Sequence, residues 1–240
     1  MKIDLNCDLG EGEPAARTRA LMRCVTSANV ACGGHAGDAE SMDLCVRLAQ
    51  QFGVRLGAHP GPWACGEFGR GAIQIDADGI ELLLLQQVGA LERTARARRV
   101  RLHHLKLHGA LYHASETDDR LAHRYLRSVA RWWPGVVIYA KANGRVAALA
   151  RQAGRKVWDE GFVDRGYLDN GALVPRDQPN ALVTDLRSVR RRVRTILEHS
   201  QIETISGGQL SLRPQTLCIH SDTPNSLALA RPVRCLVQGS

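Results

Sequence analysis

Short apolar runs of strand length alternate with stretches of helical periodicity along the whole chain. The runs predict strands over residues 2–6, 27–32, 54–58, 101–107, 136–140, 156–159 and 216–220. Asp38 can cap a helix that runs to about Gln51, with Gly53 as its stop, and Asp78 can cap another that runs to about Arg98. Further helices fit residues 15–24, 117–132, 143–152, 185–199 and 224–237. This alternation is typical of repeated βα units around a parallel sheet.

The length supports the same interpretation, because 240 residues are close to the roughly 250 of an eight-stranded β/α barrel. We therefore expect a single barrel domain over residues 1–240. Two loops, 61–75 and 161–180, are longer than usual βα connections, and long loops in a compact domain are often lids or binding segments. Residues 201–213 alternate around a Gly-Gly turn and predict a β-hairpin.

Four apolar runs lead into a histidine that is followed by a small or polar residue and a loop. These histidines are His35, His59, His108 and His220. Since the carboxyl ends of parallel strands carry the chemistry in β/α folds, we expect the four side chains to gather at one rim.

The first predicted strand and its continuation place Asp4, Asn6 and Asp8 on one side. Such a polar face can orient a metal or a cationic group, or supply a general base. A salt bridge to arginine is the structural alternative.

Further polar residues occur near the other predicted strand ends. Lys106 and His108 are expected on one strand face, where lysine can neutralise an anion and histidine can move a proton. Asp164 and Arg165 follow a strand near Glu160, and Asp222 follows His220, where it is either a site residue or an N-cap.

Composition restricts the other classes of function. The net charge of +8 comes from arginine, with five arginines at positions 187, 190, 191, 192 and 194 of one helix. No nucleic-acid-binding motif accompanies them, so we expect a solvated face or a subunit contact. No apolar run is long enough to span a membrane, and the seven cysteines show no zinc or disulfide spacing. We expect reduced thiols, a cytoplasmic protein, and neither nucleic-acid nor membrane partners.

Seven segments carry distinctive motifs: residues 4–11 (DLNCDLGE), 27–38 (SANVACGGHAGD), 57–60 (GAHP), 106–112 (KLHGALY), 162–165 (FVDR), 173–176 (LVPR) and 220–222 (HSD). Together they resemble the LamB/YcsF family of 5-oxoprolinase A subunits. The sequence departs from the family pattern at Gly34, Leu107, Ser221 and Gly71, where Phe, Pro, Gly and Arg are usual.

The resemblance implies a distorted, TIM-like β/α barrel of the kind found in glycoside hydrolases and deacetylases. It also implies ATP-dependent opening of 5-oxoproline to glutamate, with ATP and magnesium, together with two partner subunits. The expected catalytic residues are Asp8, His35, His59, Lys106, His108, Glu160 and His220. The expected substrate-binding residues are Asn6, Asn29, Arg70, Asp164, Arg165, Arg176 and Asp222.

Two other functions stay open, as does a homo-oligomer. One is a stand-alone metal-dependent amide hydrolase or deacetylase with Asp8, His35 and His59 as ligands. The other is a non-catalytic binding or assembly subunit whose arginine-rich helix is the contact surface. The identity of any metal is not determined by the sequence.

Overall fold

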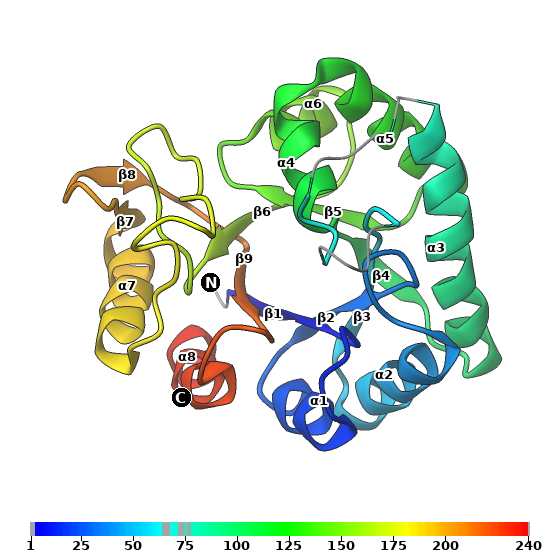
Figure 1. Cartoon of the computed structure of the whole chain (residues 1–240), viewed down its shortest axis with the longest axis horizontal. Coiled ribbons are helices and arrows are strands. Elements are labelled where there is room, and N and C mark those ends of the chain that lie inside the picture. Colours follow the sequence, from blue (N-terminus) through cyan, green and yellow to red (C-terminus); the bar gives the residue numbers. More distant parts are fainter. Residues whose placement is uncertain (1–2, 64–67, 72–74, 76–77, 240) are drawn as a thin grey trace.

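A closed barrel of parallel strands forms the centre of the molecule (Figure 1). The computed structural model describes residues 3–63, 68–71, 75 and 78–239. Seven of the described strands close the barrel in the order β1-β2-β3-β4-β5-β6-β9. Their bounds are β1 (Asp4–Leu9), β2 (Ser27–Ala31), β3 (Arg55–His59), β4 (Leu102–Leu105), β5 (Val137–Lys141), β6 (Val157–Phe162) and β9 (Thr216–His220). The α/β, TIM-like barrel expected from the sequence is confirmed.

Helices surround the strands on the outside of the barrel, as Figure 1 shows. They are α1 (Ala15–Met22), α2 (Ala39–Phe52), α3 (Gly79–Ala97), α4 (Gly109–Thr117), α5 (Asp119–Trp132), α6 (Arg145–Gln152), α7 (Leu186–His199) and α8 (Ser226–Gln238). The predicted cap of α2 is confirmed, since Asp38 and Ser41 form a reciprocal capping box and Gly53 ends the helix at φ +65°. Asp78 precedes α3, but its side chain makes no capping hydrogen bond within the described part of the chain.

The largest departures from the predicted elements are at β1, β6, β4 and α4, and most other boundaries differ by one or two residues. Strand β1 extends to Leu9 because it pairs with both β2 and β9, and β6 extends to Phe162 through its pairing with β9. Strand β4 is shorter than predicted, so Lys106 and His108 follow it rather than lie on it. The sequence prediction also missed α4, which begins at Gly109 with φ +50° directly after His108. Residue 2 of the first predicted strand lies outside the described residues.

The connection from β6 to β9 explains the distortion of the barrel. Because β6 pairs directly with β9, seven strands complete the ring, and residues 163–215 lie outside it. This connection contains α7 and the predicted hairpin, which is confirmed as β7 (Gln201–Glu203) paired antiparallel with β8 (Gln209–Ser211). Two isolated bridges, one of them Tyr167 with Leu173, fold its first part over the barrel mouth.

The interior of the barrel is unusually polar, whereas the apolar core lies between strands and helices. Asp4 is buried at the amino-terminal end of the barrel and interacts with Arg55, Tyr139 and Thr216. The salt-bridge alternative therefore holds for Asp4. Five cysteines are buried thiols, as expected: Cys7, Cys24, Cys32, Cys45 and Cys218. Cys65 lies outside the described residues.

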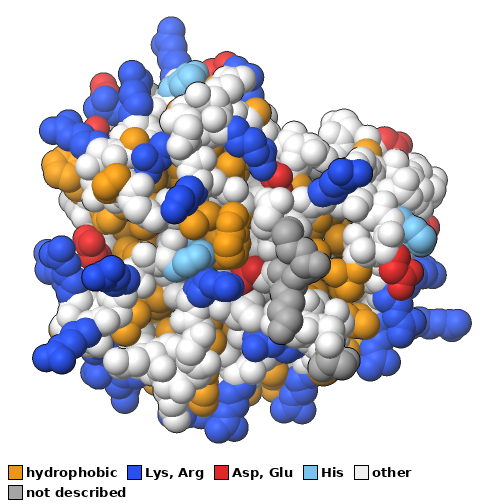
Figure 2. Space-filling view, turned by 180° about the vertical axis from the view of Figure 1, so that it is seen from behind, with side chains coloured by type: hydrophobic (Ala, Val, Ile, Leu, Met, Phe, Trp, Pro, Cys, Tyr) orange, Lys and Arg blue, Asp and Glu red, His pale blue; other side chains and the backbone are white. Residues whose placement is uncertain are grey.

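The positive charge is spread over the outside of the protein. Figure 2 shows Lys and Arg side chains around the outline of one face. On α7, Val189, Val193 and Ile196 are buried and most of the arginines are exposed, as an amphipathic helix requires. Within the described residues, no helix is long and apolar enough to cross a membrane.

Candidate functional site

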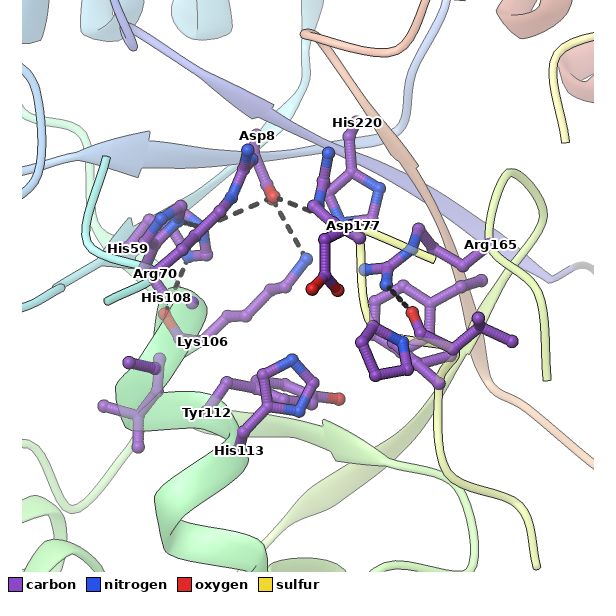
Figure 3. A pocket seen from close by; sticks show the side chains of 18 residues that line it. Asp8, His59, Arg70, Lys106, His108, Tyr112, His113, Arg165, Asp177 and His220 are labelled. Atoms are coloured by element: carbon purple, nitrogen blue, oxygen red, sulfur yellow. Dashed lines mark hydrogen bonds and ion pairs between the residues drawn. The ribbon is translucent and has the colours of Figure 1, made fainter. Parts of the chain in front are cut away.

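A cavity of about 520 Å³ lies at the carboxyl ends of the strands (Figure 3). Its ionisable and aromatic lining residues are Asp8, His59, Arg70, Lys106, His108, Tyr112, His113, Phe162, Arg165, Arg176, Asp177 and His220. Its apolar wall includes Leu173, Val174 and Pro175 from the long β6–β9 connection. This volume is within the range of small-molecule sites.

Lys106 lies between two carboxylates at the floor of the cavity. Its ammonium group is 3.0 Å from Asp8 Oδ1, 3.0 Å from Glu160 Oε1 and 3.1 Å from Cys218 Sγ. Burial alone would lower the pKa of Lys106, but Asp8, Cys218 and Glu160 hold it well above its ordinary value. Lys106 is therefore a fixed positive charge rather than a proton acceptor.

A layer of amides supports this ion pair from below. Asn29 donates 2.7 Å hydrogen bonds to Asp8 Oδ1 and to Asn6 Oδ1, and Asn6 donates to Glu160 Oε1 at 3.0 Å. Tyr112 donates to the other oxygen of Glu160 at 3.0 Å. Each buried carboxylate thus has hydrogen-bond partners that fix its orientation.

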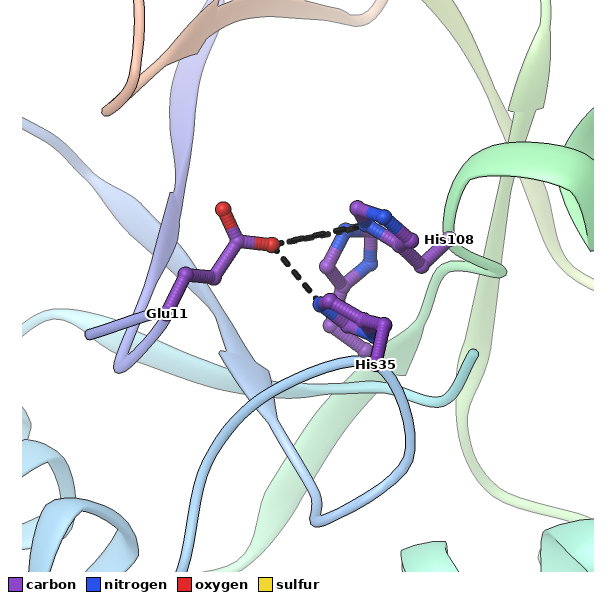
Figure 4. A group of neighbouring side chains, drawn as sticks. Glu11, His35 and His108 are labelled. Carbon is purple, nitrogen blue, oxygen red and sulfur yellow. Dashed lines mark hydrogen bonds and ion pairs between the residues drawn. The ribbon is translucent and has the colours of Figure 1, made fainter. Parts of the chain in front are cut away.

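Three histidines from the carboxyl ends of different strands and the segments after them converge on Glu11, as Figure 4 shows in part. Glu11 Oε1 is 2.9 Å from His35 Nε2, 3.4 Å from His108 Nδ1 and 3.8 Å from His59 Nε2. The rings of His35 and His108 are stacked with centroids 3.4 Å apart. Asp8 Oδ2 lies 3.4 Å from His59 Nε2 and joins this group to the lysine. We call Glu11, His35, His59 and His108 the histidine group.

The turn after β1 directs Glu11 into the barrel mouth. Gly10 and Gly12 have φ values of +75° and +98°, and the Glu13 carboxylate accepts from the backbone N–H of Gly10 and of Glu11, each at 2.8 Å. Burial raises the pKa of Glu11, but the neighbouring His108 and His35 outweigh burial and hold the pKa well below its ordinary value. The group therefore contains an ionised carboxylate.

The described part of the loop at 61–75 covers the histidine group. Phe68 lies edge-on to His35 and His108, and a Cβ at Gly69 would come within 2.6 Å of His35 Cβ. Gln87 fixes the start of this loop by bonding both the N–H and the carbonyl of Gly61.

Gly34, where the family pattern has Phe, leaves room for the Gln87 amide. A Cβ at this position would lie 2.4 Å from the Gly61 carbonyl oxygen and 2.5 Å from Gln87 Nε2. The departure at Gly34 is therefore matched to the packing of Gln87 in this chain.

His220 lies on the other side of Lys106 and has its own carboxylate. Asp164 accepts from the backbone N–H of His220 at 2.8 Å and from Thr223 at 2.7 Å, and it lies 3.0 Å from His220 Nδ1. Burial raises the pKa of Asp164, but His220 and these hydrogen bonds lower it to about 2. The ionised carboxylate orients Nδ1, and Nε2 lies 4.0 Å from Asp8 Oδ2.

Three arginines also line the cavity, Arg70, Arg165 and Arg176, and we call them the arginine wall. Arg165 is buried and donates to the carbonyls of Ala181 and Val174. Burial lowers its pKa to about 10, which leaves it protonated at neutral pH. Arg70 and Arg176 donate to the same oxygen of Asp222, at 2.6 and 3.1 Å.

Among the described residues, two groups of side chains have the separations needed to hold a metal ion. One is the histidine group, and the other consists of Asp8, Cys218 and His220. The second group already has a cation, because Lys106 Nζ contacts both Asp8 and Cys218. The expected ligand set of Asp8, His35 and His59 is thus split, with Asp8 outside the histidine group and Glu11 and His108 within it.

The structure brings together most of the residues expected from the sequence, but at two depths. Asp8, His59, Lys106, His108, His220, Arg70, Arg165 and Arg176 line the cavity. Asn6, Asn29, Glu160 and Asp164 are buried behind these residues, and His35 belongs to the histidine group. Asp222 lies at the rim rather than at a cap, since α8 begins at Ser226 after Asn225.

Sequence reasoning missed Glu11, Tyr112, Phe162, Cys218 and His104, whose Nε2 lies 2.6 Å from Asn29 Oδ1. Glu11 had a signal in its position between two glycines directly after a strand, and Tyr112 ends one of the quoted motifs. The remaining three lie on strands, where no local pattern separates a site residue from a core residue.

The fold and the site define a β/α-barrel protein with a charged binding pocket at the carboxyl ends of its strands. The chain belongs to the LamB/YcsF family, whose model matches residues 3–240. It is 38% identical over 237 residues to the A subunit of 5-oxoprolinase from Syntrophobacter fumaroxidans, covering 98% of this chain and 94% of the relative. It is also similar to the crystal structure of the lactam utilization protein of Thermus thermophilus, with 36% identity and a TM-score of 0.90 over 100% of this chain and 97% of the other.

Proposed function

We propose that this chain is the A subunit of an ATP-dependent 5-oxoprolinase that opens 5-oxoproline to L-glutamate together with two partner subunits. The observation that carries the proposal is the small cavity lined by three arginines and by Lys106, whose ammonium group lies between the carboxylates of Asp8 and Glu160. The names of the relatives in Syntrophobacter fumaroxidans and Thermus thermophilus support the choice of a lactam as substrate. The buried cysteine thiols suit a reducing compartment, so we propose the cytoplasm.

The arginine wall supplies the recognition of an anionic substrate. 5-Oxoproline carries one carboxylate, and a guanidinium binds a carboxylate through two parallel hydrogen bonds. Arg165 is held by backbone carbonyls and is therefore preorganised for this contact. When substrate or nucleotide binds, Arg176 and Arg70 release the Asp222 carboxylate and bind the anionic groups of the ligand instead.

The reaction needs activation because an amide carbonyl is a poor electrophile. In our proposal, the lactam carbonyl oxygen attacks the γ-phosphorus of ATP, the bond to the β-phosphate oxygen breaks, and ADP leaves. Water then adds to the activated carbon, the ring C–N bond breaks with a proton transferred to nitrogen, and the phosphate is released by hydrolysis. In total, 5-oxoproline, ATP and two water molecules give glutamate, ADP and phosphate. One water opens the lactam, and the other releases phosphate from the γ-carboxyl group.

The charged residues fit separate parts of this sequence. His220, oriented by Asp164, is positioned to take a proton from water, and general-base catalysis of this kind contributes about 10²- to 10⁴-fold. Lys106 stabilises negative charge that develops above the floor, where burial strengthens its effect. Asp8 holds both Lys106 and His59 in place.

The test is co-expression of this chain with the two partner subunits, followed by measurement of glutamate formed from 5-oxoproline. We expect glutamate and ADP in equal amounts with all three subunits, and neither without ATP. The His220→Asn variant should assemble and lose at least about 100-fold in kcat, whereas His199→Asn on exposed α7 should match the wild type. Absence of ATP-dependent glutamate from an assembled, folded three-subunit complex contradicts the proposal.

A further inference from the structure

The histidine group has more hydrogen-bond acceptors than donors. His59 Nδ1 lies 2.9 Å from the carbonyl oxygen of Lys106, and His108 Nε2 lies 2.9 Å from the carbonyl oxygen of Phe68. A carbonyl oxygen only accepts, so each of these nitrogens carries a hydrogen. In neutral rings, the opposite nitrogens, His59 Nε2 and His108 Nδ1, therefore both present lone pairs.

These two nitrogens are 3.0 Å apart and point toward each other. Two lone pairs at hydrogen-bond distance repel unless a proton or a cation lies between them. The two rings are almost completely buried, so water does not relieve this contact as it does at a surface.

The charges around the two nitrogens also favour a cation. The Glu11 carboxylate lies 3.4 Å from His108 Nδ1, and the Asp8 carboxylate lies 3.4 Å from His59 Nε2. Lys106 balances Asp8 and Glu160 but does not contact Glu11 among the interactions of the described residues. Among the described residues, the side-chain contacts of the Glu11 carboxylate are therefore with the three imidazoles.

We propose that Glu11, His35, His59 and His108 bind one divalent transition-metal ion of the zinc type. Neighbouring donor atoms in the group are separated by 2.9 to 3.8 Å. Four ligands at about 2.0 to 2.2 Å from a tetrahedral ion are roughly 3.3 Å apart, so the atoms are already close to coordination geometry. Three imidazoles and one carboxylate are also the donor types that zinc and its neighbours prefer.

The outer contacts of the rings match those of metal ligands. Metal-binding histidines usually donate their second ring N–H to a carbonyl or carboxylate, which sets the tautomer, and His59 and His108 both do so. His35 requires one change, because its Nε2 now bonds Glu11. Its buried Nδ1 has no partner among the described residues and takes the proton when Nε2 binds the ion.

The first test measures metal binding by the isolated full chain and is independent of 5-oxoprolinase activity. The chain is treated with chelator, dialysed and titrated with Co²⁺, and the visible absorption of the protein-bound ion is recorded. Zn²⁺ is then added in competition. We expect saturation at one ion per chain, displacement by Zn²⁺ and a rise in Tm with either metal.

Two ligand variants and one matched histidine variant make this test specific. Glu11→Gln keeps the size of the side chain but removes its charge, and His35→Asn removes a ring whose Nδ1 makes no bond within the described chain. Each should weaken binding by more than about 100-fold, beyond the effect of changing an outer contact. His199→Asn, at an exposed side chain on α7, should bind like the wild type.

The second measurement uses ¹⁵N chemical shifts of the imidazoles and does not depend on the stability of a variant. Zn²⁺ should shift His59 Nε2 and His108 Nδ1 while their partner nitrogens stay protonated. The proposal is overturned if the wild type binds no more metal than Glu11→Gln, or if the metal-free rings share a proton and their shifts ignore Zn²⁺.

Discussion

Histidines lie on both sides of Lys106, but their hydrogen bonding differs between the two sides. On one side, the Asp164 carboxylate lies next to the His220 ring. This carboxylate also accepts hydrogen bonds from the His220 backbone and from Thr223. On the other side, His59 and His108 have their outer nitrogens bonded to carbonyls, and their inner nitrogens face each other. In our proposals, the first network orients a proton-transfer residue, and the facing nitrogens of the second bind a metal ion.

The lysine that separates the two sides should have the largest effect on stability. Lys106→Met leaves the Asp8 and Glu160 carboxylates buried without their cation, and we expect a loss of about 3 to 5 kcal/mol in the free energy of unfolding. Urea unfolding measures this loss. Lys156→Met, at an exposed position, is the control and should change the free energy by less than about 0.5 kcal/mol. Equal stability of the two variants would show that Lys106 does not hold the two sides together.

The His220 side should show a specific dependence on pH. The pKa of Asp164 is about 2 in the folded protein and about 3.9 in an unfolded chain, so its ionisation stabilises the fold by about 2 to 3 kcal/mol above pH 4. Because the folded pKa is the lower one, this contribution is lost as the pH falls from about 4 to about 2. Asp164→Asn removes it, so the difference between wild type and variant should shrink over that interval.

Urea unfolding at several pH values between about 5 and 2.5 measures this change. Asp78→Asn, at a side chain that is 86% exposed, should follow the wild type throughout. A constant difference between wild type and Asp164→Asn would show that Asp164 is not held ionised by His220.

The loop that covers the histidine group should depend on the side-chain amide of Gln87. Gln87→Leu leaves the N–H and the carbonyl of Gly61 without their partner, and we expect a loss of about 1 to 2 kcal/mol. Gln86→Leu on the exposed face of α3 is the matched control. Amide hydrogen exchange at Gly61 should increase in the first variant only, and unchanged exchange would argue against Gln87 as the clamp of this loop.

The smallest effect on stability is expected at the rim, where ion pairs are partly solvated. Arg176→Gln should change the free energy of unfolding by less than about 1 kcal/mol. In the three-subunit enzyme it should raise KM for 5-oxoproline more than it lowers kcat, because it weakens binding of the carboxylate. Arg231→Gln, at an exposed position of α8, provides the comparison. A fall in kcat with unchanged KM would assign Arg176 to the chemical step instead.

Much of the fold could be predicted because the sequence signals for its helices and strands are local. The alternation of apolar runs and periodic stretches predicted the barrel, and Asp38 with Gly53 predicted the ends of α2. Positions at the ends of predicted strands indicated His59 and His220 as site residues, and both line the cavity. The predicted end of the first strand was wrong because Asp8 is polar, and its place in β1 comes from pairing with β2 and β9.

The sequence by itself determined which residue types reach the rim, because the order of strand, turn and helix sets the end of the barrel at which each lies. Only the tertiary structure decided their partners. Glu11 meets His108 and Asp164 meets His220 across long stretches of chain, and the tautomers depend on carbonyls of Lys106 and Phe68. Hydrogen-bond acceptors and charges act over a few ångströms, so contacts between distant segments establish the difference between the two sides.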